Sequence, residues 1–368
     1  MLKCGIVGLP LSGKSTVFNV ITRAGAEVKP YAGGKTEPNR ALVGVPDKRF
    51  DKLVEIFEPK SVKPAEVEFV DLAGISSGAS KGAGLGNSFL SFVSESDALL
   101  HVVRAFNNNS VPHPEETINP LRDWQIVETE LIYRDLGVIS NRLSRLDEKA
   151  AKKKLTQAES AELELLKNLQ DFLMEERPLR EFNLNAEQIK MLSGFDFMTL
   201  KPELVVLNLD ETQTGELEEM QITQEIAKAM KLKNLKLVKV FGSIEMELAQ
   251  LEPEEQEEFM KDLAIKESGR DRLIHEAYKL LGLISFFTSG SDEVRAWTLH
   301  DGQTAVDAAG TIHSDLARGF IRAQVVSYED FINNNNSFAA CRDKGVLRLE
   351  GKEYIVKDGD MIEIRFNV

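Results

Sequence analysis

The residues with the clearest chemistry form a glycine-rich run near the start of the chain. Residues 8–15 read Gly-Leu-Pro-Leu-Ser-Gly-Lys-Ser, which matches the G-x-x-x-x-G-K-[ST] pattern of phosphate-binding loops. Backbone N–H groups and the start of the next helix hold phosphate oxygens in such a loop (a P-loop). We expect Lys14 to contact the β- and γ-phosphates and Ser15 to bind Mg²⁺. The predicted nucleotide-binding residues here are Leu9, Pro10, Leu11, Ser12, Gly13, Lys14, Ser15 and Thr16.

Two further segments could complete the contacts to the metal and the γ-phosphate. Asp71-Leu72-Ala73-Gly74 closes an apolar run, as the D-x-x-G motif of GTPase-type domains does. We expect the Asp71 carboxylate to support Mg²⁺ through a water molecule and the Gly74 N–H to meet the γ-phosphate. Thr36, between the two motifs, is the expected hydroxyl ligand in the triphosphate state. The sequence thus predicts Mg²⁺ as cofactor, held by Ser15, Thr36 and, through water, Asp71.

Base recognition is expected just after the apolar run 204–207. GTPases commonly carry N-K-x-D at this place, where the Asp accepts from guanine and the Lys stem covers the base. This chain reads Asn208-Leu209-Asp210-Glu211, so Leu209 replaces the Lys and Glu211 the Asp. Guanine recognition is therefore altered, which favours ATP and leaves GTP as a second nucleotide. Asp210, one position early, is an alternative reader of the base.

The elements that must position these residues follow a clear order along the chain. Apolar runs that alternate with helical patterns predict a parallel α/β sheet. These runs are residues 2–7, 41–45, 67–70, 98–103, 204–207 and 235–241. The P-loop, the D-x-x-G motif and the Asn208–Glu211 segment each follow one of these apolar runs, whereas the segment that contains Thr36 does not. The sequence therefore predicts an α/β nucleotide-binding domain.

A different periodicity interrupts this domain. Ile132, Leu136, Ile139, Leu143 and Leu146 recur at alternating steps of four and three residues, and Leu166, Leu169 and Leu173 continue the pattern. Such spacing predicts an antiparallel helical hairpin of coiled-coil type. Its turn carries Lys149, Lys152, Lys153 and Lys154. These lysines are either a solvated tip or a basic finger that contacts RNA.

The sequence pattern changes again after Gly282, where short β segments and glycine-containing turns predict a small α+β domain. The expected domains are residues 1–117 with 200–282 for nucleotide binding, 118–199 for the inserted helices, and 283–368 for the C-terminal domain.

Composition limits the classes of function. The chain has 368 residues, 42% of them hydrophobic, and a formal net charge of −14. An acidic chain is no general binder of nucleic acid, so any RNA contact requires a local basic patch. No apolar run reaches the ~20 residues of a membrane span, the first residues do not resemble a secretory leader, and only two cysteines are present. We expect a cytoplasmic protein without a membrane partner.

Taken together, the motifs closely resemble those of the Obg-like ATPases of YchF type, in the translation-factor class of P-loop GTPases. The resemblance covers essentially the whole chain. The segments that carry it are residues 8–16, 36–39, 71–74, 82–87, 208–211, 294–298, 309–313 and 351–360. It implies an ATP-preferring G domain interrupted by a helical hairpin and followed by a TGS domain, an α+β fold of the ubiquitin-like β-grasp type. It also implies association with ribosomes and a role in translation and stress responses.

The resemblance assigns further roles to single residues. His113 corresponds to the family's candidate catalytic histidine, and Ser243 lies in the loop that usually covers the base. Ile75 is apolar, as in the family, where many GTPases place the Gln that orients water. Leu11 stands where the family has an Asn that coordinates a monovalent cation in potassium-stimulated relatives. Because leucine offers no oxygen, the resemblance does not carry potassium activation over to this chain, and the sequence leaves potassium dependence open.

These observations predict a nucleotide-dependent switch that hydrolyses ATP slowly and acts on the ribosome. Two alternatives remain at this point. One is a guanine-specific GTPase in which N-x-x-E still reads the base. The other is a nucleotide-sensing binding protein without significant turnover.

Overall fold

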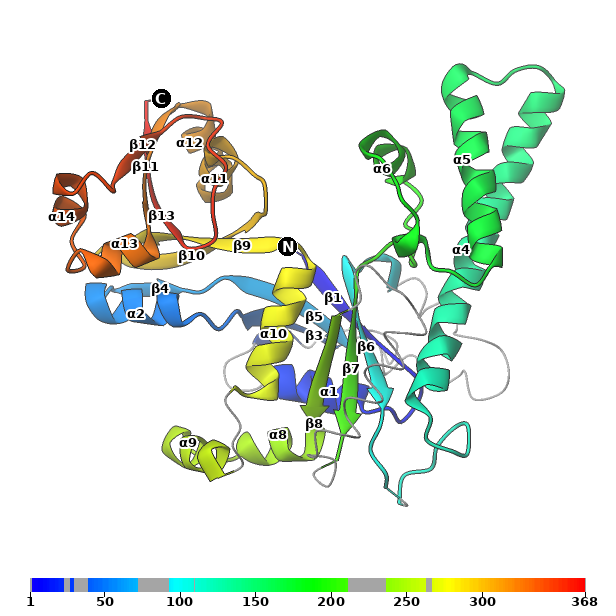
Figure 1. Ribbon diagram of the computed structural model, residues 1–368, viewed down its shortest axis with the longest axis horizontal. Helices are drawn as coiled ribbons and strands as arrows, with labels where there is room; N and C mark the ends of the chain where they lie inside the picture. Colours follow the sequence, from blue (N-terminus) through cyan, green and yellow to red (C-terminus); the bar gives the residue numbers. More distant parts are fainter. Residues whose placement is uncertain are drawn as a thin grey trace. The chain divides into compact units, whose positions relative to one another are not determined.

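The computed structural model describes residues 2–22, 27–29, 39–71, 93–108, 110–210, 236–262 and 267–367 (Figure 1). The predicted site residues Thr36, Gly74 and Glu211 lie outside these ranges, as does Ile75. The chain forms two compact units. The N-terminal unit comprises Met1–Ala41 and Glu68–Leu273, and the C-terminal unit comprises Leu42–Val67 and Ile274–Val368.

The first sheet has seven strands in the order β2-β3-β5-β1-β6-β7-β8. The strands are β1 (Lys3–Val7), β2 (Glu27–Lys29), β3 (Asn39–Gly44), β5 (Glu66–Asp71), β6 (Ala98–Arg104), β7 (Glu203–Leu209) and β8 (Lys236–Phe241). β1 pairs in parallel with β5 and β6, β6 pairs with β7, and β7 pairs with β8. These pairs confirm the predicted parallel α/β sheet.

The middle of this sheet forms the core of the N-terminal unit. Every residue of β6 and β7 is buried, as is typical of parallel strands whose two faces are both covered. The accompanying helices are α1 (Lys14–Thr22), α8 (Gly242–Leu248), α9 (Pro253–Asp262) and α10 (Gly269–Leu280), the last crossing into the C-terminal unit. Because these strands are parallel, the carboxyl ends of β1, β5, β6, β7 and β8 lie at one edge of the sheet, where ligands of such folds bind.

A pair of long helices is inserted between β6 and β7 (Figure 1). α4 (Pro120–Ala151) begins after Asn119, whose side chain accepts a hydrogen bond from the Arg122 N–H. α5 (Gln157–Met174) begins at a capping box formed by Thr156 and Glu159. The two helices bury the predicted apolar residues Ile132, Ile139, Leu143, Leu146, Leu166, Leu169 and Leu173 in one cluster. The short helices η2 (Leu179–Glu181) and α6 (Ala186–Leu192) then lead back to β7.

A buried polar network, which we call the hairpin root, fastens these helices to the sheet. Its members are His101, Trp124, Glu128, Arg180 and Glu203. Arg180 donates to both oxygens of Glu128, at 2.5 and 3.1 Å, and lies 2.8 Å from Glu203 Oε2. Glu203 Oε1 accepts from the Trp124 indole at 2.8 Å and lies 2.8 Å from His101 Nδ1.

The Arg180 guanidinium thus contacts two carboxylates, and the pKa values of these two groups shift in opposite directions. Burial, together with the charge of Glu203, raises the pKa of Glu128 well above its ordinary value. Burial acts on Glu203 in the same direction, but Arg180, His101 and Trp124 outweigh it and lower the pKa of Glu203 to about 2. Glu203 is therefore the carboxylate that holds its charge in the hairpin root.

The second sheet lies in the C-terminal unit and has the strand order β12-β11-β13-β9-β10-β4. Its strands are β4 (Ser61–Lys63), β9 (Leu283–Ser289), β10 (Glu293–His300), β11 (Phe320–Ser327), β12 (Arg348–Glu350) and β13 (Asp360–Phe366). β9 and β10 are antiparallel, and β13 is parallel to β9 and antiparallel to β11. The helices of this unit are α2 (Lys48–Phe57), α11 (Ala305–Ile312), α12 (Ser314–Arg318), α13 (Tyr328–Asn333) and α14 (Phe338–Asp343). Side chains of α11 and of the sheet share one apolar core.

The position of residues 42–67 differs from the sequence prediction, which placed them, with residues 274–282, in the nucleotide-binding domain. In the structure this segment contributes α2 and β4 to the C-terminal unit. β4 pairs in parallel with the edge of β10, and the Lys60 N–H donates to the Ser291 carbonyl at 3.2 Å. The pairing joins segments far apart in the sequence, and local patterns do not report such contacts. None of the helices in the described ranges is long and apolar enough to cross a membrane.

Candidate nucleotide-binding site

The glycine-rich loop lies between β1 and α1, as its motif predicts. Gly8 and Gly13 have φ angles of 144° and 99°, a region that L side chains rarely adopt. A Cβ on Gly13 would lie only 2.1 Å from Asn208 Nδ2, so glycine is the residue that fits there. Leu11 also has a positive φ, 61°, and its side chain is 51% exposed. A left-handed leucine costs roughly 1–2 kcal/mol, so the loop is held in shape by its surroundings.

Lys14 lies at the first position of α1, and its side chain folds back under the loop. The ammonium group donates to the carbonyls of Gly8 at 3.0 Å and Leu9 at 2.8 Å. Burial lowers the pKa of Lys14 to about 8, although the charge of Asp71 opposes this shift. The loop therefore holds a buried cation where the motif places the phosphate-binding lysine.

Ser15 and Asp71 lie together beside this lysine. The Ser15 hydroxyl donates to Asp71 Oδ2 at 3.3 Å. The two residues meet because β1 and β5 are neighbours, with Ile6 paired to Asp71 at the end of β5. A hydroxyl and a carboxylate are the oxygen ligands that Mg²⁺ prefers, so this donor set fits the predicted cofactor.

Asn208 connects the P-loop with the end of β7. Its side-chain amide donates to the Ser12 carbonyl at 3.1 Å. The backbone carbonyl of Asn208 accepts from the N–H groups of Ala105 and Phe106. A Cβ on Gly242 would lie 2.8 Å from Asn208 Oδ1. The Asn208 side chain thus lies between the P-loop and the first residue of α8, and it positions the P-loop.

The other residues predicted to contact the base have different surroundings. The Leu209 side chain is buried in an apolar cluster with Val103 and Trp124. Asp210 accepts a hydrogen bond from the Asn107 N–H at 3.0 Å, which ties the loop after β6 to the end of β7. Ser243 is exposed in the first turn of α8. Contacts of Leu209 and Ser243 with a base therefore stay predictions.

His113 lies beneath the P-loop. Together with Leu9, Pro10 and Ser12 it lines a crevice too narrow to hold a water molecule. His113 Nε2 lies 3.0 Å from Asp123 Oδ2, and its Nδ1 accepts from the Glu115 N–H at 3.1 Å. The structure brings the predicted catalytic histidine to the P-loop, and its catalytic role stays a prediction. The Ser12 hydroxyl, 2% exposed in the same crevice, has no hydrogen-bond partner in the described part of the chain.

Three residues around His113 were missed by the sequence analysis. Arg104 ends β6, and Arg122 and Asp123 lie in the first turn of α4. The signals were weak: an arginine closing an apolar strand, and an Arg-Asp pair just after the Asn119-Pro120 helix start. Such patterns are common on protein surfaces, whereas Arg104 and Asp123 are buried here.

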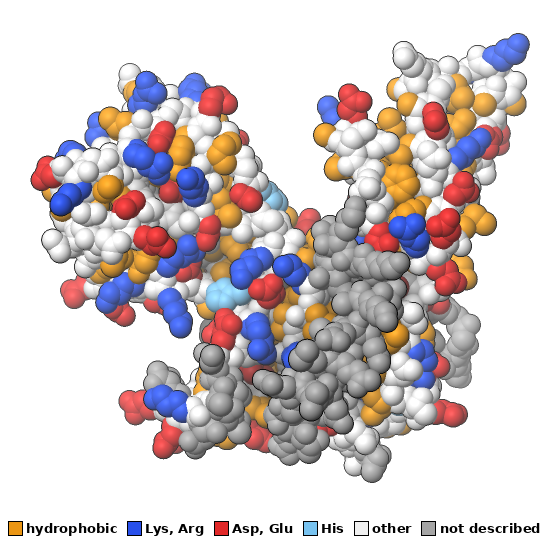
Figure 2. Space-filling view, viewed as in Figure 1, with side chains coloured by type: hydrophobic (Ala, Val, Ile, Leu, Met, Phe, Trp, Pro, Cys, Tyr) orange, Lys and Arg blue, Asp and Glu red, His pale blue; other side chains and the backbone are white. Residues whose placement is uncertain are grey.

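The predicted basic turn lies where α4 ends and before α5 begins. We call this turn the hairpin tip; its lysines are Lys149, Lys152, Lys153 and Lys154. Basic side chains project from this end (Figure 2). Lys149 pairs with Glu159 at 2.6 Å. The ammonium groups of the other three lysines make no ion pair within the described ranges. They extend into solvent, where a partner could reach them.

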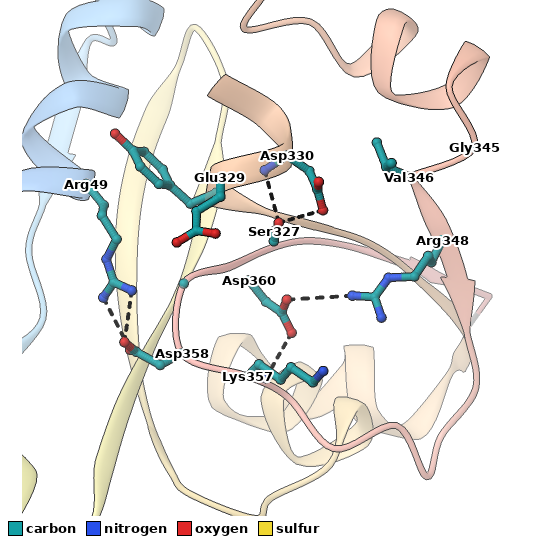
Figure 3. A pocket seen from close by; sticks show the side chains of 12 residues that line it. Arg49, Ser327, Glu329, Asp330, Gly345, Val346, Arg348, Lys357, Asp358 and Asp360 are labelled. Carbon is teal, nitrogen blue, oxygen red and sulfur yellow. Dashed lines mark hydrogen bonds and ion pairs between the residues drawn. The ribbon is translucent and has the colours of Figure 1, made fainter. Parts of the chain in front are cut away.

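A larger pocket of about 570 Å³ lies within the C-terminal unit (Figure 3). Two of its arginines lie close to carboxylates of the same lining. Arg49 of α2 donates to Asp358 at 2.9 Å, and Arg348 lies 3.8 Å from Asp360.

Comparison with known proteins then decides the family. Residues 3–135 match the family model described as "50S ribosome-binding GTPase", and residues 283–367 match the C-terminal model of YchF GTPases, described as "Protein of unknown function (DUF933)". The chain is 44% identical over 367 residues to the Ribosome-binding ATPase YchF of Bacillus subtilis, with 100% of both chains covered. It is 42% identical over 366 residues to that of Escherichia coli O157:H7, covering 100% of this chain and 99% of the relative.

The chain belongs to the YchF family. The structure of the Schizosaccharomyces pombe YchF GTPase superposes with a TM-score of 0.87 at 33% identity, covering 99% of this chain and 97% of that one. The resemblance inferred from the motifs is therefore confirmed. The YchF C-terminal model begins at residue 283, the start of β9, so it leaves out α2 and β4, which complete that unit here.

Proposed function

We propose that this chain is a ribosome-associated ATPase that works as a slow, nucleotide-dependent switch. The observation that carries the proposal is the P-loop, where a buried lysine and a Ser15–Asp71 pair converge at the carboxyl edge of a parallel sheet. This arrangement supplies a cation for the β- and γ-phosphates and oxygen ligands for a metal. The relatives' name, Ribosome-binding ATPase YchF, supports the same activity and the same partner.

Mg²⁺ is the proposed cofactor. Ser15 and Asp71 would hold it, the latter through water, together with Thr36. When bound, the metal neutralises charge on the phosphates. The residues of this chain do the remaining work: Lys14 binds the phosphates, backbone N–H groups orient them, and His113 is the proposed group that acts on the attacking water.

ATP is the proposed nucleotide. The burial of Leu209 in the core supports this choice, because neither a lysine stem nor an aspartate stands where guanine-specific proteins place them. A site that binds the base by packing discriminates weakly, so we expect GTP to compete within roughly a hundredfold in affinity. A preference for GTP beyond that range would favour a guanine-specific GTPase.

The chain's architecture and location complete the proposal. We assign the C-terminal unit to the TGS class, because its order β10-β9-β13-β11 with a crossing helix supports a β-grasp fold. We place the protein in the cytoplasm, and we propose the hairpin tip as a local contact to ribosomal RNA. Leu11 supports hydrolysis without potassium stimulation.

Calorimetric titration of ATP with Mg²⁺ into Lys14→Ala and the wild type tests the nucleotide site. We expect the variant to lose ATP binding while staying folded. Lys167→Ala is the matched control, because that lysine belongs to an exposed pair with Asp147. Wild-type affinity in Lys14→Ala would overturn the assignment.

Co-sedimentation with ribosomal subunits in each nucleotide state tests the partner. Equal sedimentation with ATP, with ADP and without nucleotide would contradict a switch. A nucleotide-sensing protein without turnover is the second candidate, which is favoured by one observation: both ring nitrogens of His113 are engaged. Single-turnover hydrolysis with and without ribosomes separates it from the ATPase.

A further inference from the structure

The loop that carries His113 is held by two arginines, one from each side. Arg104 donates to the carbonyls of Asn108 at 3.3 Å, Val111 at 3.0 Å and Pro112 at 3.1 Å. Its guanidinium also stacks on the Phe106 ring, 4.3 Å from the centroid. Because several carbonyls share one buried donor, the residues before His113 are fixed to the end of β6.

Arg122 holds the residues after His113. It donates to the Thr117 hydroxyl at 2.9 Å and the Thr117 carbonyl at 2.6 Å. It also contacts Asp123 Oδ1 at 2.7 Å, which leaves Oδ2 to face His113. Arg122 and Asp123 both belong to the first turn of α4, so this side of the loop is attached to the inserted helices.

The histidine itself is saturated by its contacts. Its Nδ1 accepts from the Glu115 N–H, so the proton of a neutral ring is on Nε2, and Nε2–H donates to Asp123. The two side chains are only 5% and 4% exposed. In this arrangement neither nitrogen can take a proton from a water molecule, because both are already bonded and water cannot reach them.

We propose that Asp123 is a positioning residue that holds His113 withdrawn and so keeps intrinsic hydrolysis low. The inference rests on the proposed function, in which His113 acts on water at the nucleotide. Release requires the Nε2–H···Oδ2 bond to break, and the acceptor is supplied by α4. A partner that binds the form with α4 displaced would therefore raise the population of free His113.

An opposite role for Asp123 makes a different prediction. A carboxylate can also orient a histidine for catalysis, and removing it would then lower turnover. The near-complete burial of both side chains favours withdrawal, since an oriented base must still meet its substrate. The two roles are separated by the sign of the change in turnover.

The test compares Asp123→Ala, Asp123→Asn, His113→Ala and the double variant His113→Ala/Asp123→Ala with the wild type. Glu162→Ala is the matched control. It also removes a carboxylate that pairs with an arginine, Arg142 of α4, but Glu162 belongs to α5 and is far from His113 in the sequence. Asp123→Asn keeps the side-chain volume but offers one acceptor oxygen in place of the two that now face Arg122 and His113, so it weakens these contacts without removing them all. Should Asp123→Ala not fold, this second variant still tests the proposal.

Two measurements are made on each variant. The first is the rate at which diethyl pyrocarbonate modifies His113, followed by mass spectrometry of the peptide, with the exposed His300 and His313 as internal references. The second is single-turnover ATP hydrolysis with Mg²⁺, alongside ATP affinity. The labelling rate reports release of the ring even where no hydrolysis occurs.

We expect Asp123→Ala to raise His113 labelling roughly tenfold or more, since a charge-assisted hydrogen bond is lost. Turnover should rise several-fold at unchanged ATP affinity, and the rise should vanish in the double variant. Asp123→Asn should give intermediate rates, and Glu162→Ala should match the wild type. Unchanged labelling, or faster labelling with lower turnover, would overturn the proposal. If neither the wild type nor any variant hydrolysed ATP, with or without ribosomes, the proposed function would be overturned, and with it the control of turnover. The labelling rates would still decide whether Asp123 holds His113.

Discussion

The two ends of the inserted helix pair use charged residues in opposite ways. At the hairpin root, Arg180 and Glu203 are each 1% exposed and bonded to several partners. At the hairpin tip, the Lys149–Glu159 pair leaves the lysine 51% exposed, and the lysines beyond it extend into water. Buried charges are costly to leave unpaired, whereas exposed pairs contribute little. The root therefore determines how the helices dock on the sheet, and the tip stays available for a partner.

Removing the shared cation at the root is the strongest test of this contrast. Arg180→Met removes the buried cation that Glu128 and Glu203 share, so we expect a loss of about 3–5 kcal/mol in the free energy of unfolding. Arg142→Met, at a pair whose arginine is 33% exposed, should cost less than about 1 kcal/mol. Urea unfolding followed by Trp124 fluorescence in a Trp297→Phe background measures both. Equal shifts of the two midpoints would remove the contrast.

The second test uses the pKa difference within the root. The raised pKa of Glu128 means that the folded state binds more protons than the unfolded state above the ordinary glutamate value, so this group lowers stability as pH rises. Glu203 acts the other way: its stabilisation is present above the ordinary value and is lost as pH falls towards about 2.

Glu128→Gln should remove the first of these effects. The stability of the variant relative to the wild type should increase from pH 5 to 7, by at most about 1.4 kcal/mol per pH unit for one proton. Urea midpoints measured across this range check the slope. A difference that stays flat with pH would show that Glu128 is ionised throughout.

The third test concerns the turn at the tip. The Thr156 hydroxyl accepts from the Glu159 N–H at 3.2 Å and caps α5. Thr156→Ala should cost about 1 kcal/mol, because the first turn of α5 loses its cap. Thermal unfolding by circular dichroism measures the change, with Thr311→Ala in the C-terminal unit as a comparison. A cost as large as that of Arg180→Met would mean that the tip also determines the fold.

The smallest change in stability is expected where binding should change most. Replacing Lys152, Lys153 and Lys154 together with Ala should alter unfolding by less than about 0.5 kcal/mol, because these ammonium groups make no ion pair in the described part of the chain. Ribosome association should weaken, most strongly at low salt, and its salt dependence should become shallower. Co-sedimentation at several salt concentrations tests this, and an unchanged salt slope would exclude the tip as the RNA contact.

The same contrast explains what the sequence could predict. The seam of the helix pair and the P-loop follow from local spacing, because Ile139, Leu143 and Leu146, or Gly13 and Lys14, are close neighbours in the chain. The root could not be found this way. Arg180 reaches a glutamate 52 residues away, and single charged residues normally lie at the surface.

The candidate site shows the same limit. The motifs predict Lys14, Ser15 and Asp71 together, because D-x-x-G and the P-loop each carry a recognisable pattern. The link of His113 to Asp123 has no pattern of its own, although the two residues are close in sequence. It depends on how the loop after β6 folds against α4, which tertiary contacts decide.

The place of β4 in the C-terminal sheet has a consequence for the order of folding during synthesis. Ser61 of β4 contacts Glu293 of β10, and 232 residues separate the two. At typical elongation rates of 5–20 residues per second, roughly 12 to 46 s pass between the synthesis of the two strands. β4 must therefore wait outside its final sheet while much of the parallel sheet, including β3 and β5 on either side of it in the sequence, can already form. A nascent chain stalled before residue 293 should expose this segment to proteases, and its protection should begin only when β10 has emerged.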